Sequence, residues 1–411
     1  MISNLKSQIS DLKSQISDLR ERAAPWLAGD GPDAMIAVCC QCNLLRNLAD
    51  FCFPAACTED ERRAVEERVL NALDQAGLLE EGQYCSISSL DLRETLFLAE
   101  RRLVPFELVL SRGGVYISED QCTSIAVNGA DHICLSVLGS GLAFRDLWSK
   151  LNFLDDRLAD ALGYAFDKRF GYLTSSLRNV GTGLLGSVIL HLPALTAFNS
   201  VAMVAQNARE RRHALYGLKS TIIAPGPANR EAGAGDPRLR IGVPGVTLVE
   251  SHGSEAFYND LSESLYGDIS EAQGDLYVLT NLRTLGESEE EVLFHLRHAA
   301  TEIIRREKAA REEFASKEHR RLEDRVARAL GVARSARLLG FTEAVSLLSS
   351  LRLGLDTGLL QGFTLPQLNE LLLVSQSAHI KMKAGQDCDE WMMGVERADL
   401  FRSRFAENRE G

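Results

Sequence analysis

Long apolar runs and an excess of basic residues are both absent from this 411-residue chain. No run of 18 or more apolar residues occurs, and a helix needs about that many to cross a bilayer. The N-terminus lacks the apolar core of a signal peptide. The chain has 45 Lys and Arg against 57 Asp and Glu, a net charge of −12. Binding to nucleic acid or to anionic membranes through bulk charge requires a basic surface. We therefore expect a cytoplasmic protein whose partners are proteins, without a membrane or nucleic-acid role.

The cysteines lack the spacing of a metal site. Five of the nine lie between residues 36 and 57, in the spacing C-C-x-C-x9-C-x4-C. Structural zinc needs four ligands, usually in C-x2-C pairs, and no second pair or nearby His completes a set. Cys39 and Cys40 would point to opposite faces of a strand. We expect reduced thiols that serve as small buried hydrophobic residues, and no bound metal.

A heptad pattern opens the chain at residues 1–22. Isoleucine and leucine recur there at spacings of three and four, at Ile2, Leu5, Ile9, Leu12, Ile16 and Leu19. Such a pattern is typical of a coiled coil that would pair two subunits. Because fewer than three heptads are present, an irregular low-complexity leader is an equally good interpretation.

The next part, residues 23–310, has the mixed pattern of an α+β domain. Thr58 and Glu61 form a predicted capping box for a helix over 58–79, and a second helix is expected over 144–165. Residues rich in Val, Ile and Leu predict strands. These segments are 106–119, 123–139 and 275–286. Residues 171–195 should run from a strand through a glycine turn into an apolar helix, and 219–262 is a Pro- and Gly-rich loop-like insert. Residues 311–411 predict an all-helical C-terminal domain.

Few single motifs in this chain indicate chemistry. The NVGTG loop at 179–183 could bring backbone N–H groups to a phosphate, but it lacks a Walker lysine, and a tight turn into a core helix explains it better. His132 after Asp131, and His191, are expected to be structural. Asp155 and Asp156 are expected to be solvated residues near a helix start.

Several longer segments resemble the ATP:guanido phosphotransferases, and within them the bacterial protein arginine kinases. GYLTSSLRNVGTGLLGSVILHLPAL is similar to the family segment GYLTSCPTNVGTGLRAS followed by HLPAL. YGDISEAQGDLYVLTNLRTLGESEEE and LRNLADFCFP match further family segments. The helical C-terminal sequence, including LNELLLVSQ, is similar to the domain that marks the protein-arginine branch. The resemblance implies an α+β catalytic domain, built on a mostly antiparallel sheet flanked by helices, and a helical C-terminal domain.

The family transfers the γ-phosphoryl group of ATP to a guanidinium with the help of Mg²⁺, arginines and a carboxylate base. The resemblance places Gly129 and Ala130 where the family has its glutamates, and Ser176 where it has a thiol. Gln41 and Asn43 replace the two arginines of SSRxR, and Arg178 stands where the family has Thr. The implied nucleotide-binding positions are Cys39, Cys40, Gln41, Cys42, Asn43, Arg46, Arg102, Cys134, Arg178, Leu185, Gly186, Ser187, Val188, Ile189, Glu263 and Asp268.

Phosphoarginine recognition in this branch uses an RDxxRA segment near the C-terminus. Residues 393–398 read MGVERA here, so only Arg397 and the alanine after it match. The resemblance therefore implies Arg397 as the one remaining phosphoarginine-binding position.

The missing charges predict a pseudokinase that acts by binding proteins in quality control or stress response, as a homodimer or with an active homologue. The alternative is an active protein arginine kinase that uses displaced residues, with ATP and Mg²⁺ as its cofactors. A small-guanidine kinase is disfavoured, because that branch carries its helical domain at the N-terminus.

Overall fold

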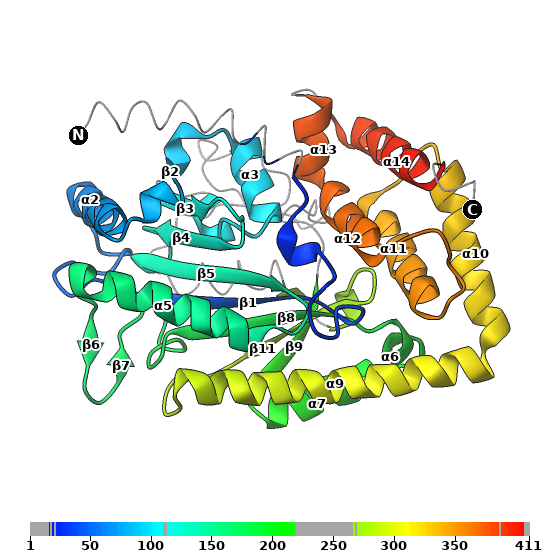
Figure 1. Ribbon diagram of the computed structural model, residues 1–411, viewed down its shortest axis with the longest axis horizontal. Helices are drawn as coiled ribbons and strands as arrows, with labels where there is room; N and C mark the ends of the chain where they lie inside the picture. Colours follow the sequence, from blue (N-terminus) through cyan, green and yellow to red (C-terminus); the bar gives the residue numbers. More distant parts are fainter. Residues whose placement is uncertain are drawn as a thin grey trace, which may run out of the picture.

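The computed structural model describes residues 16, 19, 22–109, 113–218, 266–267, 269–385 and 388–406 (Figure 1). The predicted heptad leader, apart from Ile16 and Leu19, and the predicted insert 219–262 lie outside these residues. Ile16 is buried against the hydrophobic cluster around Phe97, and Leu19 packs on the same cluster.

A nine-stranded sheet forms the centre of the molecule, in the order β10-β9-β11-β8-β1-β5-β4-β3-β2. Neighbouring strands in it pair antiparallel. The strands are β1 (Ala37–Arg46), β2 (Gly82–Ser86), β3 (Gly114–Ser118), β4 (Thr123–Val127), β5 (Ile133–Ser140), β8 (Leu184–His191), β9 (His213–Leu218), β10 (Tyr266–Gly267) and β11 (Leu276–Asn281). A separate hairpin joins β6 (Phe166–Asp167) to β7 (Gly171–Tyr172).

Helices cover the sheet on both faces (Figure 1). The helices of this part are α2 (Glu59–Gln75), α3 (Leu92–Glu100), α4 (Phe106–Val109), α5 (Phe144–Leu162), α6 (Pro193–Ala197), α7 (Val201–Glu210) and α9 (Glu289–Lys317). Cys40, Cys42 and Leu44 of β1 belong to the core cluster that also contains residues of α5 and α9. At the other face, α3 and α4 pack over β2, β3 and β4.

Along β1, half-buried polar side chains alternate with fully buried apolar ones, so one face of the sheet is partly polar here. Gln41 and Asn43 are half-buried, whereas Cys40, Cys42 and Leu44 between and beside them are fully buried. Since successive side chains of a strand point to opposite faces, Gln41 and Asn43 share the face opposite α5 and α9. Two of the nucleotide-binding positions that the resemblance implies, Gln41 and Asn43, therefore lie on this face.

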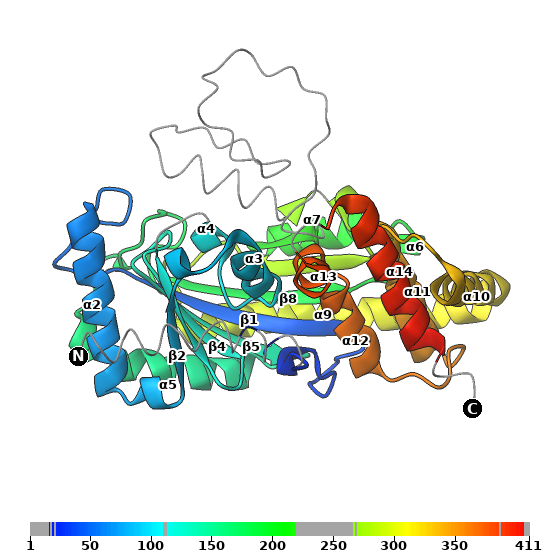
Figure 2. The same cartoon turned by 90° about the horizontal axis from the view of Figure 1, so that it is seen from above.

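The C-terminal region is helical, as predicted, and gathers at one end of the molecule (Figure 2). It contains α10 (His319–Ser335), α11 (Phe341–Asp356), α12 (Leu365–Val374), α13 (Ser377–Ala384) and α14 (Glu390–Ala406). Within the described residues, no helix combines the length and the apolar composition needed to span a bilayer.

Three element predictions were wrong. Residues 184–191 form the central strand β8 and not an apolar helix, because their Val- and Ile-containing run is buried between β1 and β11. Residues 106–109 form the short helix α4 where a strand was expected. The charged sequence of 289–330 predicts one long helix, but α9 ends at Lys317 and a second helix, α10, begins at His319.

The capping box at Thr58 is confirmed, since its hydroxyl accepts a bond from the Glu61 N–H and the Glu61 carboxylate accepts one from the Thr58 N–H. Ser288 and Glu291 form the same arrangement at the start of α9.

Candidate functional site

Gln41 and Asn43, at the two positions of β1 where the resemblance implies arginines, bond to neighbouring side chains. Gln41 Nε2 donates to Asn43 Oδ1 at 3.1 Å and to Ser136 Oγ at 2.8 Å. Arg102 donates to Gln41 Oε1 from Nε at 3.1 Å and from Nη2 at 2.9 Å. The guanidinium of Arg102 is therefore already bonded within the protein. The result is a neutral amide and hydroxyl strip with a single engaged cation at its edge.

The neighbouring strands supply no further charge to this strip. Ser187 of β8 lies opposite Gln41, and Leu185 lies opposite Asn43. Gly186 and Val188 alternate with them and are buried towards α9, where a Cβ on Gly186 would meet Leu296 Cδ2 at 2.7 Å. Ile189 packs in the cluster that contains Cys39, and Cys134 of β5 is half-buried opposite Leu45.

The three cysteines of β1 are buried thiols. Burial raises the pKa of Cys39 and Cys42, and it raises the pKa of Cys40 to about 12. Cys40 Sγ also accepts a bond from the Ala143 N–H at 3.3 Å. Thiols with raised pKa values stay protonated near neutral pH and are poor nucleophiles and metal ligands. Their role as small buried hydrophobic residues is confirmed.

Arg46 is buried, and its guanidinium is bonded mainly to groups inside the protein. Its side chain is 1% exposed, and Nε and Nη2 donate to Asp155 Oδ2 at 3.2 and 2.7 Å. Nη1 donates to the carbonyl oxygens of Leu45 at 3.1 Å and Thr182 at 2.8 Å. The guanidinium carbon lies 3.5 Å from the centre of the Tyr172 ring. Four of the five N–H groups of this guanidinium are thus bonded inside the protein.

This pair also corrects the prediction for Asp155. The residue is buried in the interior of α5 and not solvated at a helix start. An isolated buried carboxylate would be strongly disfavoured, and Arg46 supplies the charge that allows its burial.

The segment between β4 and β5 carries one carboxylate, and it is used for structure. Asp131 Oδ1 accepts bonds from Asn47 Nδ2 and from the Ser175 N–H, both at 2.6 Å. Burial raises the pKa of Asp131 above its usual range. Gly129 and Ala130 are half-buried and bring no ionisable group. No described residue in the 128–132 turn is therefore placed as a solvent-facing base.

His132 is a buried, neutral histidine. Its Nδ1 accepts a bond from the Leu48 N–H at 3.1 Å, so the ring proton sits on Nε2, which lies 3.5 Å from Cys57 Sγ. Burial lowers the pKa of His132 to about 4. With its proton directed at the sulfur, this ring cannot accept a proton from Cys57, and the two do not form a nucleophile–base pair.

The NVGTG loop packs against the chain and precedes a strand, so no helix dipole assists it. Gly181 has φ +121°, and a Cβ there would lie 2.3 Å from the Thr284 carbonyl oxygen. Thr182 N–H donates to that same oxygen at 3.0 Å. The close approach of two loops explains the glycine. Ser176 is half-buried beside the loop, and Arg178 is exposed.

Arg397 is buried below the surface of the helical region. Its Nε donates to the Ser375 carbonyl oxygen at 2.7 Å, and Nη1 donates to that of Leu339 at 2.9 Å. The side chain joins α14 to the segments before α11 and after α12. Glu263 and Asp268 lie outside the described residues.

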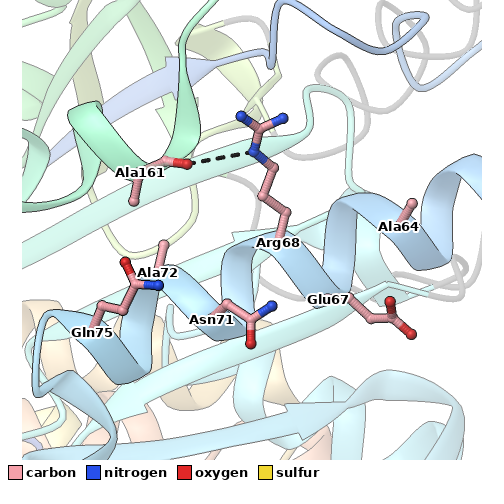
Figure 3. Close-up of a pocket in the computed structure, with 7 residues that line it drawn as sticks. All are labelled: Ala64, Glu67, Arg68, Asn71, Ala72, Gln75 and Ala161. Atoms are coloured by element: carbon pink, nitrogen blue, oxygen red, sulfur yellow. Dashed lines mark hydrogen bonds between the residues drawn. The ribbon is translucent and has the colours of Figure 1, made fainter.

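A cavity of about 350 Å³ lies between α2 and α5, away from the polar strip (Figure 3). Arg68 stands at its centre, with Nε donating to the Ala161 carbonyl oxygen at 3.4 Å and Nη1 to Asp50 at 2.8 Å. The cavity is shallow, and its lining includes both Glu67 and Arg68. It has no geometric connection to the positions that the resemblance implies.

The sequence analysis did not identify two buried carboxylates that hold distant segments of the chain together. Glu307 of α9 accepts bonds from the Ala194 and Leu195 N–H groups at 3.1 and 2.9 Å, and from Arg311 Nε at 2.8 Å. Glu100 accepts bonds from the first N–H groups of α13, at Ala378 and His379. The backbone N–H groups that they bind are more than 100 residues away in the sequence. A glutamate within a helix also gives no sequence pattern that would indicate its burial.

Comparisons with known proteins agree with this architecture. The family model described as the ATP:guanido phosphotransferase C-terminal catalytic domain matches residues 64–221 and 261–310. The model described as the protein-arginine kinase McsB C-terminal domain matches residues 319–411.

Relatives match this chain over nearly the whole length of both proteins. A protein-arginine kinase from Pelotomaculum thermopropionicum is 32% identical over 386 residues, covering 93% of this chain and 95% of the relative. One from Symbiobacterium thermophilum is 32% identical, covering 93% and 96%. A duplicated taurocyamine kinase from Schistosoma mansoni with bound transition-state analogue components shares the fold, with a TM-score of 0.50 at 17% identity. That match covers 69% of this chain and 34% of the longer duplicated one. The chain belongs to the ATP:guanido phosphotransferase family, in its protein-arginine kinase branch.

Proposed function

We propose that this chain is a pseudokinase of the protein-arginine kinase branch, which acts in the cytoplasm by binding proteins. The carrying observation is the neutral strip on β1. Gln41 bonds to Asn43, to Ser136 and to Arg102, at the positions where phosphates would need arginines.

Magnitudes support the loss of catalysis. A positioned general base contributes roughly 10²–10⁴ in rate, and Gly129 and Ala130 cannot replace one. A single preorganised charge-stabilising donor contributes about 10²–10³. These effects are not strictly additive, but a missing base together with missing arginines removes most of what phosphoryl transfer requires.

The retained residues have structural roles that do not depend on nucleotide. Arg46 neutralises Asp155 inside the domain, and Gly181 allows two loops to touch. The HLPAL segment places the start of α6 against Glu307. Retention of family motifs is thus compatible with a fold kept for binding, either as a homodimer or with an active homologue.

An active enzyme that uses displaced residues is the competing function. Arg178 is exposed at the edge of the loop, and Arg102 borders the strip. Neither can act as a base at neutral pH, since an arginine side chain stays protonated.

A phosphoarginine assay separates the two functions. Purified protein is incubated with Mg·ATP and an arginine-rich protein substrate, and phosphoarginine is measured by mass spectrometry and acid-labile ³¹P signal. The Pelotomaculum protein-arginine kinase serves as the positive control. We expect no turnover above the no-enzyme background. Turnover that disappears in Arg102→Ala or Arg178→Ala would establish the displaced-residue enzyme instead.

A further inference from the structure

Exposed apolar side chains gather on three segments near the β6–β7 hairpin. We call the residues 166–172, 176–180 and 282–286 the hairpin–loop surface. Leu177 is 81% exposed and Leu285 is 53% exposed. Exposed apolar side chains also occur at Phe166, Phe170 and Leu282.

Hydrogen bonds hold the three segments side by side. The Tyr172 N–H donates to the Gly181 carbonyl oxygen at 2.8 Å, which joins the hairpin to the NVGTG loop. Thr284 Oγ1 donates to the Val180 carbonyl oxygen at 2.8 Å, which joins that loop to 282–286. In Figure 1 the hairpin projects beyond α5, close to the start of α9. The exposed apolar residues therefore belong to one connected, well-braced part of the molecule.

The charges on this surface are positive although the chain is acidic. Lys168, Arg169, Arg178 and Arg283 lie within the three segments, against the single carboxylate of Asp167. The side chains of Lys168, Arg178 and Arg283 make no hydrogen bond or ion pair with other residues in the described part of the chain. The surface thus carries a net charge of +3 on a protein of net charge −12.

Carboxylates also border this surface, and some of them are engaged by other residues. Glu287 Oε1 lies 3.5 Å from Arg212 Nη1, and its Oε2 lies 3.3 Å from His295 Nδ1. Glu291 accepts the capping bonds of Ser288 at the start of α9. Glu289 and Glu290 stand in the same first turn. They border the surface but do not lie within its three segments.

We propose that the hairpin–loop surface docks an acidic segment of a protein partner that also carries apolar side chains. Charge complementarity selects this occupant, because four cations next to exposed Leu and Phe match carboxylates interspersed with apolar residues. A second copy of the acidic chain is the other occupant to be tested. The inference rests on the proposed binding role and names the surface that performs it.

Fluorescence anisotropy with defined probes tests this surface. The main probe is a short fluorescein-labelled peptide in which Asp and Leu alternate. Two control peptides replace Asp by Lys or Leu by Ser. We expect the Asp–Leu peptide to bind best and its affinity to fall as the salt concentration rises.

Two pairs of substitutions locate the binding. Leu177→Ser with Leu285→Ser removes apolar contact, and Arg178→Glu with Arg283→Glu reverses charge. Each pair of substitutions should lower the affinity for the Asp–Leu peptide by about tenfold or more. The matched control, Trp391→Ser with Arg320→Glu, changes one exposed apolar and one exposed basic residue of the helical region and should leave the affinity unchanged. Protection of 166–180 and 282–286 from hydrogen exchange on peptide addition should accompany binding.

Several results would overturn the proposal. One is that the Asp–Leu peptide does not bind, and another is that either control peptide binds equally well. The third is that neither pair of substitutions changes the affinity for the Asp–Leu peptide. Sedimentation that shows a dimer sensitive to those pairs would replace the acidic partner by a second copy. These measurements contain no nucleotide, so they are independent of the kinase assay. Phosphoarginine formation in that assay would refute the pseudokinase proposal but would leave the docking proposal to the peptide-binding results.

Discussion

At Arg46, a charged side chain that looks functional in the sequence is the centre of a buried structural cluster. Asp155, two carbonyl oxygens and the Tyr172 ring surround its guanidinium. Breaking a buried ion pair leaves an uncompensated charge, which costs about 3–5 kcal/mol. Arg46→Ala should therefore lower the free energy of unfolding by about that amount in urea denaturation.

The double variant and an exposed pair provide the controls for Arg46. Arg46→Ala with Asp155→Ala should be less destabilised than the sum of the single changes, because neither charge is left alone. Arg328→Ala removes an exposed partner of Asp324 and should cost about 1 kcal/mol or less. An Arg46→Ala protein as stable as Arg328→Ala would refute the structural role.

His132 gives the folded protein a pH-dependent stability. Its folded pKa is about 4, lowered by burial from 6.5, so between these values the unfolded chain binds more protons. Stability is then fully present above pH 6.5 and falls as the pH drops towards 4, by roughly 2–3 kcal/mol. Unfolding free energies measured across this window should show the decline.

A substitution at His132 identifies the source of that slope. His132→Asn keeps an acceptor for the Leu48 N–H and should flatten the dependence between pH 6.5 and 4. His319→Asn, at an exposed histidine of α10, should leave the slope unchanged. An unaltered slope in His132→Asn would assign the effect to the other buried histidines.

Among the elements, the NVGTG loop has a structural role that accounts for Gly181. Gly181→Ala places a Cβ at 2.3 Å from the Thr284 carbonyl oxygen at a φ of +121°. One of the two loops must shift, and we expect a loss of about 1–3 kcal/mol. Gly331 of α10 has open space around its Cα, so Gly331→Ala should stabilise the protein by roughly 0.5–1 kcal/mol. Thermal unfolding of the two variants should move in opposite directions.

The sequence predicted most elements but misassigned β8. The capping box at Thr58 predicted the start of α2, because its hydrogen bonds are local. LLGSVILH fits a buried strand or a helix equally well, and pairing with β1 and β11 decides between them. That pairing is non-local and leaves no local pattern in the chain.

Within the candidate site, the sequence predicted which charges are absent, because a substitution is visible without coordinates. It did not predict where the remaining charges point. The partner of Arg46 is 109 residues away, and only packing brings α5 beneath β1. For the same reason the buried Asp155 was taken for a solvated residue.

At the scale of the whole molecule, buried polar contacts tie the sheet to the helical region. Glu307 and Arg311 of α9 hold the start of α6, and Arg311 also reaches Asp356 of α11 at 2.7 Å. Glu100 of α3 caps α13. These contacts brace the fold through side chains of the protein itself.

Nucleotide affinity tests the central claim more directly than turnover, because ATP is common to the family whereas the protein substrate is specific to each member. Isothermal titration calorimetry of Mg·ATP into the intact chain should give no binding at concentrations up to about 1 mM, the upper range of typical enzyme KM values. The Pelotomaculum protein-arginine kinase, titrated in parallel, should give a measurable heat. Saturable binding of Mg·ATP to this chain, weakened by Arg102→Ala, would contradict the account.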